Sequence, residues 1–131
     1  MVRFVVKGRP VSIQGSASSR AKWAAAVANA AVGKCAAPLD GNDLRIRITF
    51  FYNTLPDFDT DNISKPICDA LNGSIYHDDH QLGERHARRK DIHGSYQIQD
   101  VDPALAAAIT DGEDFVYIEV EQIEAAEANN L

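Results

Sequence analysis

The side chains best suited to chemistry lie between residues 57 and 79. Acidic residues gather there around one lysine, at Asp57, Asp59, Asp61, Asp69, Asp78, Asp79 and Lys65. Carboxylates this close in the chain repel one another unless a positive charge lies among them. A hard divalent cation, which prefers oxygen ligands, would supply that charge. The segment therefore predicts a divalent-metal site.

Asp59, Asp61 and Asp79 are the candidate metal ligands. Asp59 and Asp61 flank one residue, and in extended backbone residues two apart point the same way. Lys65 follows Asp61 by one helical turn, close enough to pair with it or with a bound ligand. Asp79 lies in the connection that follows and could return to the same place. Such a set suits Mg²⁺, which would polarise a phosphate and activate water while Lys65 stabilises developing charge.

Two other interpretations of the acidic residues remain. Asp57, Asp59 and Asp61 match the first ligands of a calcium-binding EF-hand loop, but Asn62 and Cys68 stand where that loop needs glycine and glutamate. A lysine inside the loop also opposes calcium. The second interpretation is structural, with the aspartates acting as helix caps and turn formers.

The order of predicted elements is that of one α+β domain spanning residues 1–131, with helices packed on a mixed sheet. Strands are expected at 2–6, 44–52, 82–92 and 115–123. Helices are expected at 20–32, with Ser18 or Ser19 as N-cap, at 61–71, and at 102–109, with Asp102 as N-cap and Pro103 in first position. Pro66 suggests that the 61–71 helix starts late or bends near Ser64.

Strand 44–52 shows the clearest alternation. One predicted face is apolar, formed by Leu44, Ile46, Ile48 and Phe50, and the other carries Arg45, Arg47 and Thr49. The two arginines could either face solvent or contact phosphate.

The net charge of −6 at first argues against a nucleic-acid ligand. However, nine of the 19 acidic residues and none of the 13 basic residues lie within 99–131. Residues 1–98 thus hold 13 basic and 10 acidic residues, a net charge of +3, and many of those acids belong to the proposed metal site. We expect this part to bind a polyanion, and the acidic segment to face solvent or to cover the basic surface when no ligand is bound.

One motif of the chain resembles the signature of RusA-type Holliday junction resolvases. It consists of Asp59, Asp61, Asn62, Lys65, Pro66, Asp69, Ala70, Leu71, Asn72 and Gly73, followed by Tyr76, Asp78, Asp79 and Gln81. Phages and prophages often carry this family. The opening 4–12 also resembles the first strand and loop of the family. The resemblance covers most of residues 1–88 and resumes at the last strand.

The resemblance implies a magnesium-dependent, homodimeric endonuclease that cuts four-way DNA junctions symmetrically in recombination and repair, with Mn²⁺ as a possible substitute metal. By matching position, Asp59, Asp61 and Asp79 would be the catalytic metal ligands and Lys65 the essential lysine. Asp69 and Asp78 would have secondary roles. The chain departs from the family in lacking most of a basic cluster after the first strand, where only Arg9, Arg20 and Lys22 remain. Residues 97–114 resemble an insertion.

DNA contact is expected mainly from the basic run after the acidic turn, through Arg85, Arg88, Arg89 and Lys90, with Arg9, Arg20 and Lys22 added. On a strand, Arg88 and Lys90 share one face and Arg85 and Arg89 the other. The alternative function is a catalytically weak, junction- or partner-binding module of the same fold, and a third is a calcium-binding structural protein.

The remaining features point to a cytoplasmic protein. Cys35 and Cys68 lack metal-binding spacing and are expected to be reduced thiols. The sequence shows no signal-peptide pattern and no apolar run long enough to span a membrane. Residues 124–131 are expected to be frayed.

Overall fold

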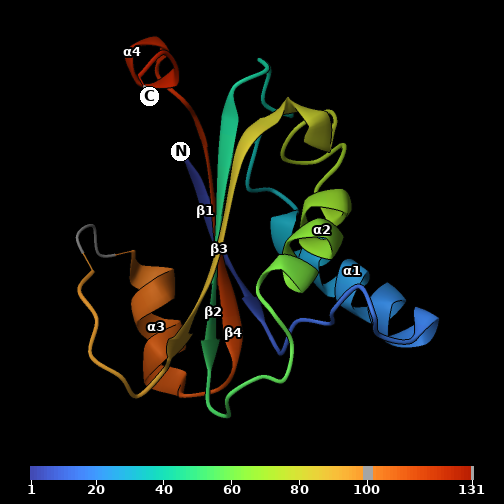
Figure 1. Ribbon diagram of the computed structural model, residues 1–131, viewed down its shortest axis with the longest axis vertical. Coiled ribbons are helices and arrows are strands. Elements are labelled where there is room, and N and C mark those ends of the chain that lie inside the picture. Colours follow the sequence, from blue (N-terminus) through green and yellow to red (C-terminus); the bar gives the residue numbers. More distant parts are fainter. Residues whose placement is uncertain (99–101, 131) are drawn as a thin grey trace.

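The computed structural model describes residues 1–98 and 102–130, which form one four-stranded sheet with helices on both faces (Figure 1). In chain order the elements are β1 (Val2–Lys7), α1 (Ala17–Ala31), β2 (Leu44–Tyr52), α2 (Asp61–Ala70), the short 3₁₀ helix η1 (Asp79–Gln81), β3 (Leu82–Asp91), α3 (Pro103–Asp111), β4 (Phe115–Gln122) and α4 (Ala125–Ala128). The predicted α+β fold with a mixed sheet is confirmed.

The strand order is β1-β4-β2-β3. β4 pairs antiparallel with both β1 and β2, whereas β2 and β3 are parallel. Parallel strands need a crossover connection, and α2 supplies it. The acidic stretch therefore lies on the connection between β2 and β3, and β3 is left at the edge of the sheet.

The larger core lies between the sheet and the pair α1 and α2, which cover the same face in Figure 1. Its sheet side comes from the alternate apolar residues of β2 that the sequence predicts, and its helix side includes Trp23, Val27, Ile63 and Ile67. Ile63 and Ile67 are completely buried, which stabilises α2 against the sheet by roughly 1.5–3 kcal/mol per side chain.

The opposite face was expected to be polar, but α3 covers part of it. Phe51 and Phe115 stack there with ring centroids 4.6 Å apart, and Leu105 and Ala108 of α3 pack in the same cluster. The alternation in β2 predicted only one buried face because α3 is distant in sequence. A smaller second core results.

The prediction that Arg45 faces solvent or phosphate is wrong. Its side chain is only 6% exposed and pairs with Glu84, Glu121 and Glu127. Glu127 belongs to α4, so part of the acidic C-terminal segment neutralises an arginine of the sheet. Within residues 124–131, which were expected to be frayed, the structure has the short helix α4 at Ala125–Ala128, and residue 131 lies outside the described residues.

The start of α1 differs from the sequence prediction, whereas the start of α3 agrees with it. α1 begins at Ala17 and its N-cap is Ser16, whose hydroxyl accepts a hydrogen bond from the Ser19 N–H. The predicted caps, Ser18 and Ser19, lie inside the helix. In the expected insertion, α3 has the predicted N-cap Asp102 and first residue Pro103, and residues 99–101 lie outside the described residues.

None of the helices in the described part of the chain is both long and apolar enough to cross a membrane.

Candidate functional site

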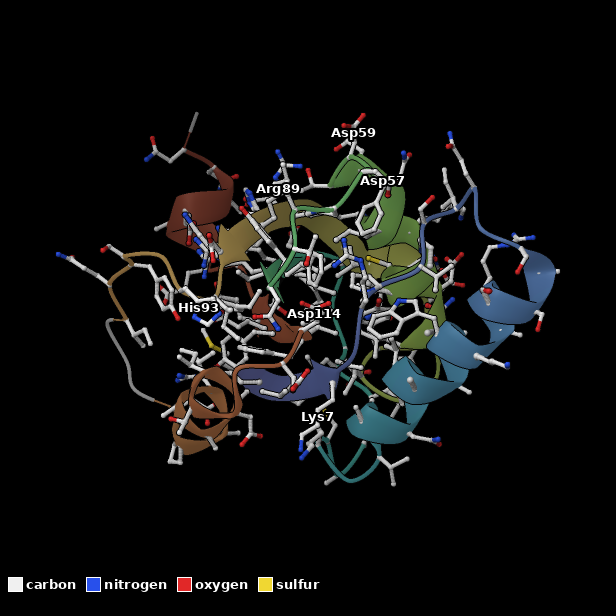
Figure 2. The ribbon with its side chains drawn as sticks, turned by 90° about the horizontal axis from the view of Figure 1, so that it is seen from below. Lys7, Asp57, Asp59, Arg89, His93 and Asp114 are labelled. Atoms are coloured by element: carbon white, nitrogen blue, oxygen red, sulfur yellow. The ribbon has the colours of Figure 1, made fainter. Side chains whose placement is uncertain are left out.

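Asp59 and Asp61 lie at the start of α2. The Asp59 carbonyl accepts the Asn62 N–H at 3.0 Å, which makes the turn into the helix. Thr60 has helical backbone angles, φ −60° and ψ −30°. The expectation that Asp59 and Asp61 align as in extended backbone is therefore wrong, since a turn and not a strand joins them. Both side chains are exposed, and Asp59 points outward from the rim that also carries Asp57 and Arg89 (Figure 2).

Pro66 lies inside α2 without delaying its start. Proline has no N–H, so the carbonyl four residues earlier, that of Asn62, has no helical partner. The Ile13 N–H donates to that carbonyl at 3.0 Å. The proline thus frees an acceptor through which the loop after β1 is fastened beside the acidic start of α2.

Lys65 pairs with Asp69, at 3.3 Å between Nζ and Oδ2, one turn further along α2. Lys65 therefore pairs with Asp69 and not with Asp61, which was the expected partner. Both partners are largely exposed, so the pair contributes little stability and can exchange readily for a phosphate ligand.

The turn that carries Asp79 is held from inside by Gln81, which is 5% exposed. Its Oε1 accepts the N–H groups of His77 and Asp78, and its Nε2 donates to the carbonyls of Leu39 and Gly41. One amide therefore joins the acidic turn to the loop before β2. Asp78 caps η1 by accepting the His80 N–H, which is the main reason that its pKa falls to about 2.

Tyr76 ties the same turn to the end of α2. Its buried hydroxyl donates to the Cys68 carbonyl at 2.6 Å, and burial raises its pKa. Burial likewise raises the pKa of the neighbouring Cys68 thiol to about 11. Asp79 accepts a hydrogen bond from Arg85 of β3 at 3.3 Å. Asp79 is thereby the most firmly placed of the candidate ligands.

A single chain does not bring the candidate ligands together. Asp61 opens α2, whereas Asp79 follows the far end of this 10-residue helix, about 15 Å in length. Within residues 1–98 and 102–130, no group of three His, Cys, Asp or Glu side chains is arranged to hold a metal ion.

The basic run of β3 divides between the two faces of the sheet, as the alternation predicts. Arg85 and Arg89 lie opposite Ile46 and Phe50 of β2, on the face that α2 covers. Arg88 and Lys90 lie on the other face, so the expected DNA-binding residues do not form one surface.

The N-terminal candidates also separate. Arg9 pairs with Asp114 at 3.2 Å and lies over the Phe50 ring, which gives it a structural contact. Asp114, which is half-buried, also accepts the Asn53 N–H at 2.7 Å, and it is labelled in Figure 2. Arg20 and Lys22 are exposed on α1.

The family model of endodeoxyribonuclease RusA matches residues 16–99, which include α2, the acidic turn and β3. The chain belongs to the RusA family. It is therefore an endonuclease of the Holliday junction resolvase type, a family that acts on junction DNA and generally uses a divalent metal. No curated protein matches the chain.

Tyr76 and Gln81 belong to the sequence motif of this RusA endonuclease, but no role was assigned to them from the sequence. Both are buried polar residues that position the acidic turn. Their presence in the motif was the only sign of this role in the sequence, since a polar residue within a catalytic motif often orients the catalytic groups. Asp114 gave no such signal because it lies in a segment expected to face solvent.

Proposed function

We propose that the chain is a magnesium-dependent endonuclease that resolves four-way DNA junctions by symmetric phosphodiester hydrolysis, in cytoplasmic recombination and repair. The observation that carries this proposal is the position of the oxygen ligands within the family match. Asp59 and Asp61 begin the crossover helix, and Asp79 lies on a turn that two buried polar side chains hold in place.

The donor set fits Mg²⁺ or Mn²⁺, because both are hard cations and all three candidate ligands are carboxylates. When bound, the metal would polarise the scissile phosphate and lower the pKa of a water molecule. Lys65 would leave Asp69 and stabilise the charge that develops on the phosphate. Arg85 would balance Asp79 until the metal binds.

One copy of the chain keeps Asp79 beyond the far end of α2 from Asp59 and Asp61. We therefore propose that the ligand set is completed in a homodimer, which would also supply one site for each strand to be cut. Symmetric cleavage needs two sites related by a two-fold axis, and a two-fold dimer provides that arrangement.

Cleavage of a synthetic four-way junction tests the function. We expect paired, symmetric nicks with Mg²⁺ and fewer or none without it. Asp59→Asn should abolish the nicks, whereas Asp57→Asn, a matched change in an exposed aspartate outside the motif, should leave them. Metal-independent cutting, or equal activity of the two variants, would refute the proposal.

Mixing two inactive variants tests whether the site is shared between copies. In a heterodimer of Asp59→Asn and Asp79→Asn chains, a shared arrangement leaves one site with all its carboxylates, and single nicks should return. If each chain holds its own complete site, both sites of the heterodimer stay defective and no nicks appear.

The alternative is a junction-binding module with weak chemistry. It is favoured by the ion pairs that already engage Lys65 and Asp79 within one chain. Tight junction binding without nicks in either Mg²⁺ or Mn²⁺ would support this alternative over the proposed function.

A further inference from the structure

A groove of about 620 Å³ crosses the sheet face opposite α2. Its floor is made of alternate residues from all four strands. The register places Arg3 and Arg47 on either side of Glu119, and on β3 it places Arg88 opposite Thr49 and Lys90 opposite Phe51. The groove and the acidic residues of α2 therefore lie on different faces of one sheet.

The charges that line this groove are mainly positive. Arg3, Arg47, Arg88 and Lys90 contribute to its lining, and Glu119 is the one carboxylate among its described lining residues. Arg47 is partly balanced by Glu121 at 3.0 Å. Arg88 and Lys90 form no ion pair with the residues that the structure describes, so the part of the groove along β3 has an unbalanced positive charge that suits an anionic ligand.

Arg88 is held ready for such a ligand. Its Nε donates to the Thr49 hydroxyl at 2.9 Å, and Thr49 is only 2% exposed. A guanidinium oriented by a buried partner loses less conformational freedom when it binds a phosphate. Tyr96, whose ring packs edge-on against Phe51 with centroids 5.4 Å apart, adds an apolar wall. Cations beside an apolar wall match the phosphates and sugars of a DNA strand.

We propose that this groove binds the phosphodiester backbone of a second arm of the junction, while the face that carries α2 binds the strand to be cut. The inference rests on the proposed action on junction DNA. β3 is an edge strand, and its cations alternate between the two faces. This strand would therefore lie between two arms of the junction at the branch point. A linear duplex has no branch point and no second arm.

Salt-dependent binding tests the inference. Fluorescence anisotropy would measure the affinity for a labelled four-way junction and for a linear duplex, without divalent metal so that cleavage plays no part. Lys90→Ala is compared with Lys34→Ala, a matched change in an exposed lysine outside the groove. Arg88→Ala is a second variant, with its melting temperature as a check on folding.

For the junction, we expect Lys90→Ala to reduce the slope of log K against log salt by about 0.9 for each groove that binds an arm, and so by about 1.8 for the proposed homodimer, so that the affinity lost between about 50 and 200 mM salt shrinks about 12-fold. Lys34→Ala should leave the slope unchanged. The duplex slope should be unchanged in both variants, since a duplex has no second arm for the groove.

An unchanged junction slope in Lys90→Ala would overturn the inference, and so would an equal change for the duplex. It would also be overturned if Lys90→Ala altered the oligomeric state and not DNA binding, because the groove would then join copies of the chain. Failure of the proposed function is a separate result, seen when the wild type binds junctions but cuts none.

Discussion

Replacing Gln81 by methionine should destabilise the chain and displace the acidic turn. Methionine has nearly the size and shape of glutamine, so the change removes the amide without opening a large cavity. All four hydrogen bonds of that amide are lost, two to N–H groups of the turn and two to carbonyls before β2.

The size of the effect follows from the backbone groups left behind. Each lost hydrogen bond costs about 0.5–1.5 kcal/mol net, and more where water cannot replace the partner. His77 and Gly41 are exposed, so water can replace their partner, whereas Asp78 and Leu39 are half-buried. We expect the free energy of unfolding to fall by about 3 kcal/mol, a large share of the roughly 5–15 kcal/mol typical of a domain.

Urea denaturation followed by the fluorescence of the buried Trp23 measures this change. Gln122→Met is the matched control, because Gln122 is exposed and its Nε2 donates to the Asp43 and Ile123 carbonyls at longer distances of 3.2 and 3.5 Å. Junction cleavage under conditions where both variants are folded should also fall further in Gln81→Met. A difference in unfolding free energy below about 1 kcal/mol between the variants would refute the role given to this amide.

Further outcomes follow from the other buried polar groups. Tyr76→Phe removes the hydrogen bond to a buried carbonyl and should lower the free energy of unfolding by about 1–2 kcal/mol, measured in urea. Hydrogen bonds from Arg45 hold the pKa of Glu84 below its ordinary 4.5, so their stabilisation is complete above that pH and is lost as the pH falls through the lowered pKa. Arg45→Met should destabilise the chain by about 2 kcal/mol at neutral pH and make the loss of stability below about pH 4.5 shallower, as pH-dependent melting would show. Burial raises the pKa of Cys68 to about 11, whereas Cys35 is partly exposed. Iodoacetamide at pH 8 should therefore modify Cys35 in the folded chain and reach Cys68 only in urea, as peptide mass analysis would show. Modification of Cys68 in the folded chain would contradict its burial.

Local patterns in the sequence predicted most of the elements. The alternation in β2, the apolar stripe of α2 and the Asp-Pro start of α3 each depend on neighbouring residues and on one period of the backbone. The start of α1 was missed because several serines in succession could each serve as its cap, and only the hydrogen bond to Ser16 distinguishes them.

The second face of the sheet could not be predicted in the same way. Arg45 looked exposed because its neighbours alternate, yet its partners come from β3, β4 and α4. The burial of a charge depends on which distant carboxylates surround it, and strand order decides that. The split of the basic run was predictable, but not that one half would line a groove with Arg3 and Arg47.

The sequence by itself determined the family and the candidate metal ligands, because the motif from Asp59 to Gln81 is a local pattern of residue types. The tertiary structure decided where those candidates lie. α2 lies in the crossover between the parallel strands β2 and β3, and this keeps Asp61, at the start of the helix, apart from Asp79, which follows its far end. The spacing of residues along a chain does not reveal that distance, because it depends on how the helix packs on the sheet.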